Sequence, residues 1–232
     1  MDTLIKPQIL SPVLILITYL SSVKNGKFTC DRYLINHFLY LLTSLSIYFT
    51  SLKYVNDNDV TLGLLQKVGV SLGIIVLLYS INNVNNSILQ HVIWLIVLVL
   101  FSLIIRYDKY DRELIENVFQ KMMIIILICG LIAINFSKYI KPSMEFVLIL
   151  GLILVLILHI IDVFFLKGKY QSLLSHISVF IFSGLIIYDT NFIIKRGKDC
   201  ISSGDPMYLD NMVNMFLNLF NLFQNLLEVM DE

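Results

Sequence analysis

Residues 146–166 read FVLILGLILVLILHIIDVFFL, and this long apolar run indicates the fold class of the chain. A helix that crosses a hydrocarbon core of about 30 Å needs about 20 predominantly apolar residues. The run meets that requirement, and its only ionisable side chains are His159 and Asp162. It shows no period-2 alternation, so its many Ile and Val residues do not indicate strands. Because an open sheet edge leaves backbone groups unpaired in lipid, the run predicts a membrane-spanning helix.

Six further runs of this kind predict a polytopic membrane protein. They are Tyr33–Leu52, Leu62–Ile81, Ile88–Ile105, Met122–Ser137, Leu173–Ile194 and Met207–Met230. An additional run, Gln8–Val23, is shorter and contains Pro12. We expect it either to span the membrane or to lie in the interface as an anchor. The predicted fold is an all-α polytopic helix bundle with seven transmembrane helices, the last one central, plus this extra N-terminal hydrophobic segment.

The composition agrees with a membrane protein and excludes several other classes. Of 232 residues, 57% are hydrophobic and 15% are charged, whereas soluble domains carry about 25% charged residues. The net charge is zero, which argues against a nucleic-acid partner and leaves the lipid bilayer as the expected one. The connectors are short and hold no Gly/Ser linker. We therefore expect an N-terminal segment or anchor at residues 1–29 and one seven-helix membrane domain at residues 30–232.

The connectors and the cysteines say less about topology. The longest polar connectors, Arg106–Gln120 and Lys195–Pro206, have the mixed charge of solvated loops. Lys and Arg residues divide equally between the two sides of the predicted bundle, so their count assigns no orientation. Three cysteines leave at least one thiol free. By alternation of the runs Cys30 and Cys200 fall on the same side, and we expect free thiols there on a cytosolic face.

Ionisable side chains inside the predicted spans are candidates for function, because hydrocarbon disfavours charge. They are Lys67, Asp162, Asp189, His37, His91, His159 and His176. Lys67 is five residues inside its run and is expected to extend to the interface. Asp162 follows His159 by three residues, and a local hydrogen bond between them is favoured over metal binding. The histidines lie on four different runs with no i, i+4 pair, so we expect no metal site.

The last two runs carry the strongest polar pattern. Asp189 lies in the stretch GLIIYDTN, residues 184–191, with apolar residues beyond it, so it must be protonated, paired or water-exposed. Five asparagines of the last run recur at spacings of three and four residues on one helical stripe: Asn211, Asn214, Asn218, Asn221 and Asn225. Because amides facing lipid are untenable, we expect the stripe to face the bundle interior. The stripe either forms hydrogen bonds between helices or lines a water-filled pore.

These two runs resemble the transmembrane Bax inhibitor motif family, and its viral Golgi anti-apoptotic members in particular. The family's sixth helix ends in Gly-x-x-x-Tyr-Asp-Thr, which matches Gly184, Tyr188, Asp189 and Thr190. The family's last helix has a spaced pattern that matches Tyr208, Asn214, Phe216, Asn221 and Phe223, with Leu226 and Leu227 following. The remainder of the chain agrees with the family in the number and length of its hydrophobic runs.

The resemblance implies a protein that lets Ca²⁺ leak from Golgi or endoplasmic-reticulum stores and inhibits apoptosis. Ca²⁺ is then a permeant ion, and no cofactor is expected. Asp189 becomes the gate residue, with Asn218 in the position of the family's second aspartate and the rest of the asparagine stripe lining the pore. Relatives place a basic residue in their second helix, which makes Lys67 a candidate counter-ion for Asp189. Because an amide does not titrate, we expect weaker pH gating than in relatives with paired acids.

Two other classes of function are alternatives. One is a non-conducting membrane binder that suppresses cell death through self-association or other membrane proteins of the cell-death pathway. Asn218 favours this class, because an acid of the family's pair is absent. The other is an intramembrane aspartyl protease, whose Gly-x-Gly-Asp motif corresponds here only to Ser202-Ser203-Gly204-Asp205 in a polar connector. The first glycine of that motif is missing, so we expect no enzyme activity.

Overall fold

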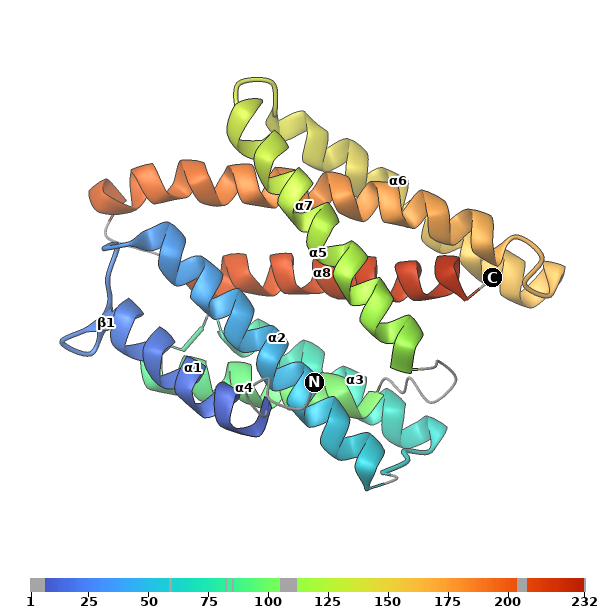
Figure 1. The fold of residues 1–232 in the computed structure, drawn as a ribbon, viewed down its shortest axis with the longest axis horizontal. Coiled ribbons are helices and arrows are strands. Elements are labelled where there is room, and N and C mark those ends of the chain that lie inside the picture. The colour runs from blue at the N-terminus through green and yellow to red at the C-terminus, as the bar shows by residue number, and fades with distance from the viewer. Residues whose placement is uncertain are drawn as a thin grey trace. The chain divides into compact units, whose positions relative to one another are not determined.

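The computed structural model describes residues 7–58, 60–81, 83, 84, 86–104, 112–203 and 208–231. Within these residues the elements are α1 Pro7–Ser22, β1 Val23–Lys24, β2 Lys27–Phe28, α2 Tyr33–Asp57, α3 Leu64–Ile81, α4 Ser87–Ile104, α5 Arg112–Asn135, α6 Pro142–Ile161 with a π-helical turn Asp162–Leu166, α7 Gln171–Ser203 and α8 Tyr208–Met230 (Figure 1). Apart from the two short strands, all of these elements are helical. The predicted all-α helix bundle is therefore confirmed.

Four of the helices are long and apolar enough to cross a membrane. Their candidate spans are Tyr33–Val55, Glu113–Asn135, Pro142–Leu166 and Gln171–Cys200. The apolar helices Ser11–Ser22, Leu65–Ile81 and Ile88–Ile104 are shorter. α8 is not among the four, because its five asparagines and Gln224 lower its mean hydropathy. The count of seven crossings stays a prediction.

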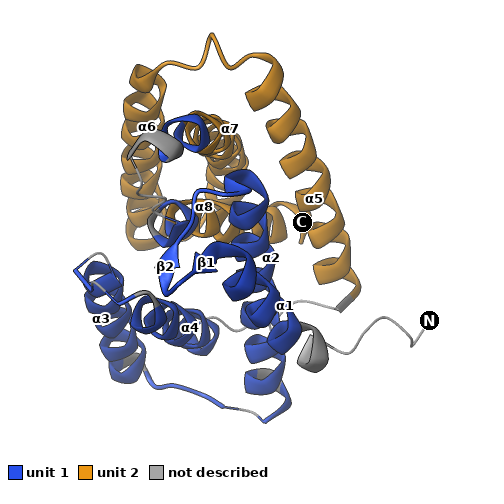
Figure 2. Ribbon diagram, turned by 90° about the vertical axis from the view of Figure 1, so that its left-hand side faces the viewer, with its two compact units in different colours: residues 1–109, 196–213 blue, residues 110–195, 214–232 orange. Residues whose placement is uncertain are grey.

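The helices form two compact units, which Figure 2 colours separately. Unit 1 comprises residues 1–109 and 196–213, and unit 2 comprises residues 110–195 and 214–232. The boundaries fall inside α7 and α8, so the last turns of α7 and the first turns of α8 belong to unit 1.

Unit 1 is built around α2, which packs against α1 and α4, while α3 packs against α4. α1 and α2 are joined by the hairpin β1–β2, in which Val23 pairs with Phe28. The two-residue turn is Asn25-Gly26, and both residues have positive φ angles of 53° and 75°. Asn-Gly is the dipeptide that such tight hairpins favour, because it tolerates this left-handed backbone. The turn therefore folds α1 back along α2.

Unit 2 contains α5, α6 and the parts of α7 and α8 named above. A tight turn joins α6 to α7, with Lys167 and Gly168 at φ angles of 57° and 78°. The Asp162 carboxylate fixes this turn by accepting the backbone N–H of Tyr170 at 3.0 Å. The predicted hydrogen bond between His159 and Asp162 is therefore wrong. The left-handed residues bring a backbone donor to the carboxylate, which is buried.

Two connectors predicted as polar loops are partly helical. α5 begins at Arg112 rather than at Met122, and α7 continues to Ser203 rather than ending at Ile194. In α5 the extension carries an amphipathic pattern, because Val118 and Met122 are both buried, and Glu113 lies in the first turn, where the helix dipole favours an acid. In α7 the extension is held by Lys195, whose ammonium donates to the carbonyl of Ile140 at 3.3 Å.

Candidate functional site

The two residues singled out as a gate are in contact. α7 carries Asp189 and α8 carries Asn218, and the Asn218 amide Nδ2 donates to Asp189 Oδ2 at 2.7 Å. Both side chains are half-buried. The Asn218 amide can donate because its nitrogen carries hydrogens, whereas a carboxylate at this position would repel Asp189. The acid is thus paired by a neutral donor.

Asp189 is level with the connection between α5 and α6, not with the middle of those helices. Asn191, two residues further along α7, donates to Ser137 Oγ at 2.7 Å and to the carbonyl of Ala133 at 3.3 Å. Lys195 contacts the carbonyl of Ile140 in the same connection. The pair therefore lies where α5 ends and α6 begins, within reach of polar groups.

A close antiparallel contact of α6 with α7 brings a second acid to this level. A Cβ at Gly184 would lie 2.8 Å from Leu148 Cδ2, and a Cβ at Gly151 would lie 3.4 Å from Ile181 Cδ1. Continuing this register by one turn places Glu145 opposite Tyr188. The Glu145 carboxylate acts electrostatically on the Tyr188 hydroxyl and on Asp189.

Three other motif residues lie in α7 and α8 near this pair. Gly184 leaves room for the Leu148 side chain, because a glycine has no Cβ to collide with it. Thr190, next to Asp189, is 5% exposed, and Phe223 of α8 is 2% exposed. These residues pack the helices around the pair rather than facing solvent.

The asparagines of α8 do not share one environment. Asn211 is buried, Asn218, Asn221 and Asn225 are half-buried, and Asn214 is exposed. Asn221 and Asn225 donate to the carbonyls four residues earlier in their own helix, both at 2.8 Å. The expectation that the whole stripe faces the bundle interior stays a prediction. The opposite, apolar face of α8 is buried, because apolar side chains gain most from leaving water. Its buried residues are Met212, Met215, Phe216, Leu219, Leu222, Phe223, Leu226 and Leu227.

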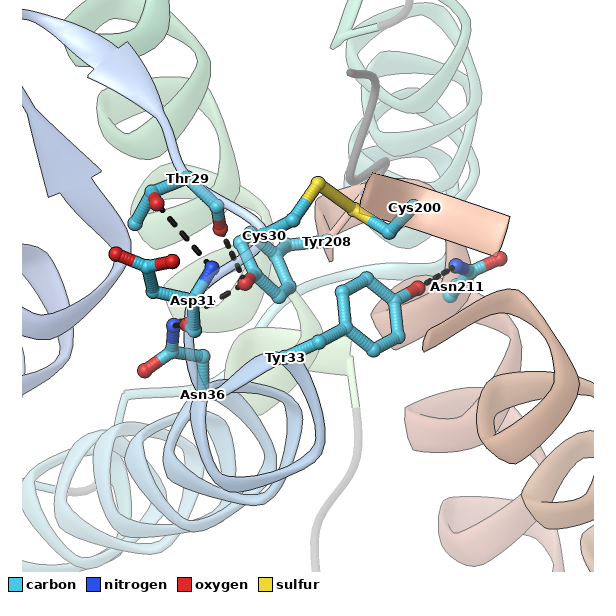
Figure 3. The surroundings of a disulfide bond; sticks show 8 residues. All are labelled: Thr29, Cys30, Asp31, Tyr33, Asn36, Cys200, Tyr208 and Asn211. Atoms are coloured by element: carbon cyan, nitrogen blue, oxygen red, sulfur yellow. Dashed lines mark hydrogen bonds between the residues drawn. A yellow bond between two sulfur atoms is a disulfide. The ribbon is translucent and has the colours of Figure 1, made fainter. Parts of the chain in front are cut away.

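The motif residues at the start of α8 form a second cluster, in unit 1 (Figure 3). The Tyr208 hydroxyl donates to the carbonyl of Thr29 at 2.6 Å and accepts the Asn36 amide at 3.1 Å. The Asn211 amide donates to the Tyr33 hydroxyl at 2.9 Å. The rings of Tyr33 and Tyr208 stack with centroids 5.1 Å apart. The first turn of α8 is thus fastened to residues 29–36.

A disulfide joins Cys30 to Cys200 beside this cluster, with Cα atoms 5.7 Å apart. The expectation of free thiols at these two positions is therefore wrong. Alternation placed both cysteines on one side, and the fold brings them into bonding distance. Cys129 is the free and buried thiol, as the odd count required.

Some predicted residues lie apart from the pair or outside the described chain. Lys67 is half-buried near the start of α3 in unit 1, whereas Asp189 belongs to unit 2, so its role as counter-ion stays a prediction. Gly204 and Asp205 of the protease-like motif lie outside the described residues. Among the side chains that the structure describes, no group of three or more His, Cys, Asp or Glu residues could hold a metal ion.

Sequence reasoning missed Glu145 and the partners of Tyr208. Glu145 stands in the first turn of α6, where an acid is ordinary, and only the glycine register reveals what faces it. Thr29 and Asn36 lie more than 170 residues from Tyr208, so no periodicity connects them. The one sequence signal for this cluster was the alternation of the runs, which predicts Cys30 and Cys200 on the same side.

An all-α chain with several helices long and apolar enough to cross a membrane is a polytopic membrane protein. The family model "Inhibitor of apoptosis-promoting Bax1" matches residues 27–232. The chain belongs to this Bax inhibitor family and is a multi-pass membrane protein with an anti-apoptotic role. α1 precedes the matched range. No curated protein and no solved structure matches the chain.

Proposed function

We propose that this protein lets Ca²⁺ leak from Golgi or endoplasmic-reticulum stores and thereby opposes apoptosis. The observation that carries the proposal is the Asp189–Asn218 pair, an acid held between α7 and α8 at 2.7 Å. A carboxylate in a helix of a membrane protein marks an ion path by default, because its burial is costly. Asp189 supplies the charge that attracts the cation.

Three oxygen-bearing side chains support a divalent cation as the permeant ion. Glu145 adds a second negative charge close to Asp189, and Asn218 contributes an amide oxygen beside them. Ca²⁺ prefers carboxylate and carbonyl oxygens, and rings of acids select cations in channels. Ca²⁺ acts here as a passing ion rather than a bound cofactor.

The amide stripe supports a watery path. Asn214 is exposed, and Asn218 and Asn221 are half-buried. An accessible row of amides is untenable against lipid, because hydrocarbon offers no hydrogen-bond partner. The accessible side of α8 therefore faces water or another protein, and water next to Asp189 is what a leak requires.

The proposal is tested by measuring store Ca²⁺ in cells with an organelle-targeted reporter. Expression of the wild type should lower the store level, and Asp189→Asn should restore it. Asp57→Asn, the same change at an exposed residue at the end of α2, is the matched control and should behave as the wild type. A store level that wild-type expression does not change would overturn the proposal.

The second candidate is a non-conducting binder that suppresses cell death through partner membrane proteins. Asn218 favours it, because the neutral amide replaces an acid of the family's pair. The same cells distinguish the two functions. If the protein is a binder, store Ca²⁺ stays unchanged, and the wild type and Asp189→Asn protect equally well from cell death. If it is a leak, Asp189→Asn loses both the effect on store Ca²⁺ and the protection.

A further inference from the structure

The Cys30–Cys200 disulfide closes a loop between residues 170 positions apart. Cys30 lies between β2 and α2, and Cys200 lies in the last turns of α7. Both belong to unit 1. A covalent link across so long a separation restricts the chain far more than a single hydrogen bond does. Its surroundings therefore depend on whether the bond is intact.

Those surroundings are the contacts that hold the motif end of α8. Figure 3 shows Tyr208 and Asn211 reaching Thr29, Asn36 and Tyr33 around the two sulfur atoms. A Cβ at Gly197, one turn before Cys200, would lie 2.9 Å from the Tyr33 ring. The C-terminal end of α7 and the N-terminal end of α8 therefore both contact residues 29–36. Among the described residues, the disulfide is the only covalent cross-link at this contact.

The two cysteine residues differ in exposure. Cys30 is half-buried, whereas Cys200 is 0% exposed. The candidate span of α7 ends at Cys200 and that of α2 begins at Tyr33, so the bond lies at the water-facing end of both helices. Cys30 is the more exposed of the two residues, so we expect a soluble thiolate to attack its sulfur, with Cys200 as the leaving thiolate.

We propose that the Cys30–Cys200 disulfide is a reversible redox site whose cleavage releases residues 29–36 from the ends of α7 and α8. The reductant is a dithiol. Its thiolate attacks Cys30 Sγ, the S–S bond breaks, and Cys200 leaves as a thiolate that takes up a proton. The second thiol of the reductant then displaces Cys30, so two electrons and two protons pass to the protein and the reductant becomes a disulfide.

Cleavage acts on unit 1 alone, because neither cysteine belongs to unit 2. The Asp189–Asn218 pair and the contacts of Asn191 with Ala133 and Ser137 contain no atom of the site. Reduction should therefore loosen the Tyr208 cluster and leave the unit 2 contacts in place. This inference does not rest on the Ca²⁺ leak, since its readout is structural.

The test uses the purified full chain in detergent, with and without dithiothreitol. After denaturation and alkylation the untreated protein should carry one alkyl group, on Cys129, and the reduced protein three. Hydrogen exchange of peptides covering residues 29–36 and 208–213 should rise on the order of tenfold or more on reduction, because their contacts open locally. Peptides covering residues 133–145 should not change.

Variants separate the bond from side effects of the reagent. Cys30→Ser should show the fast exchange without reductant, and Cys129→Ser, the same change at the free cysteine, should behave as the wild type. Oxidised dithiothreitol should restore one alkyl group and slow exchange. Three alkyl groups in the untreated protein, unchanged exchange at residues 29–36 after reduction, or failure to reoxidise would each overturn the proposal.

Discussion

At position 218 the chain has an amide, where the resemblance to the family implies a carboxylate, and this difference changes the chemistry facing Asp189. The amide donates to the acid at 2.7 Å. Two carboxylates in this place would share a proton instead. Asn218 thus provides the hydrogen bond that the Asp189 carboxylate accepts.

Removing the donor should destabilise the protein. We expect Asn218→Ala to lower the free energy of unfolding by about 1–3 kcal/mol, because the Asp189 carboxylate loses a charge-assisted hydrogen bond in a half-buried place. Asn225→Ala is the matched control, since its amide donates only to a carbonyl of its own helix, and it should cost less. Chemical unfolding in detergent, followed by circular dichroism, measures both. Equal costs would contradict the role given to Asn218.

The same position should set the pH response. We expect the wild-type Ca²⁺ leak to vary little between about pH 6 and 8, because an amide at 218 does not titrate. Asn218→Asp should make the leak pH-dependent, because two adjacent carboxylates then share a proton. Store-release rates at several pH values measure this. A steep wild-type response that Asn218→Ala abolishes would contradict the expectation.

Among the helix contacts, Gly184 and Gly197 each allow a close approach, but the side chains that they face differ in how easily they can move. A Cβ at Gly184 would meet the end of the Leu148 side chain, which can rotate away. A Cβ at Gly197 would meet the Tyr33 ring at 2.9 Å. That ring cannot move freely, because Asn211 binds its hydroxyl and Tyr208 stacks on it. Gly197 is therefore the less replaceable of the two.

We expect Gly197→Ala to destabilise unit 1 by about 1–3 kcal/mol through overpacking against the Tyr33 ring. Gly69→Ala in α3 is the control, because a Cβ there meets nothing within 4 Å. It should be neutral or stabilise by about 0.5–1 kcal/mol through helix propensity. Fluorescence of Trp94, the single tryptophan and a buried residue of unit 1, reports both unfolding transitions. A neutral Gly197→Ala would show that the ring yields.

Hydroxyl pairs join α1 to α2 along their length. Ser11 bonds to Ser46 at 2.8 Å, and Thr18 bonds to Thr43 at 2.7 Å. We expect Thr18→Val, which keeps the shape and removes the hydroxyl, to cost roughly 0.6–2 kcal/mol in the unfolding of unit 1. Thr61→Val, at an exposed loop residue, should cost nothing measurable. If both variants unfold alike, α1 contributes little to unit 1.

Most helix positions follow from the sequence, because hydrophobic length alone marks them. α2, α3, α4, α7 and α8 begin within two residues of the predicted starts. The polar ends were misjudged, as at Lys195 and Arg112, because charged residues form helices as readily as loops. The α6–α7 turn depends on a carboxylate meeting the backbone of Tyr170, which no hydropathy pattern encodes.

At the scale of the whole molecule, the two sites were predictable to different degrees. The Asp189–Asn218 pair followed from a motif on one helix and a heptad stripe on the next. The Tyr208 cluster did not, because its partners come from the other end of the chain. The disulfide was missed for a similar reason: alternation says which side a cysteine is on, and only packing says which cysteines meet.

The Ca²⁺ leak is tested most directly with the purified protein in liposomes loaded with Ca²⁺ and no other protein. Efflux should exceed that of protein-free liposomes and be equal for the wild type and Asp57→Asn. For Asp189→Asn it should fall on the order of tenfold, which corresponds to about 1.4 kcal/mol at the barrier. Wild-type efflux no faster than that of empty liposomes, or an undiminished efflux through Asp189→Asn, would contradict the account.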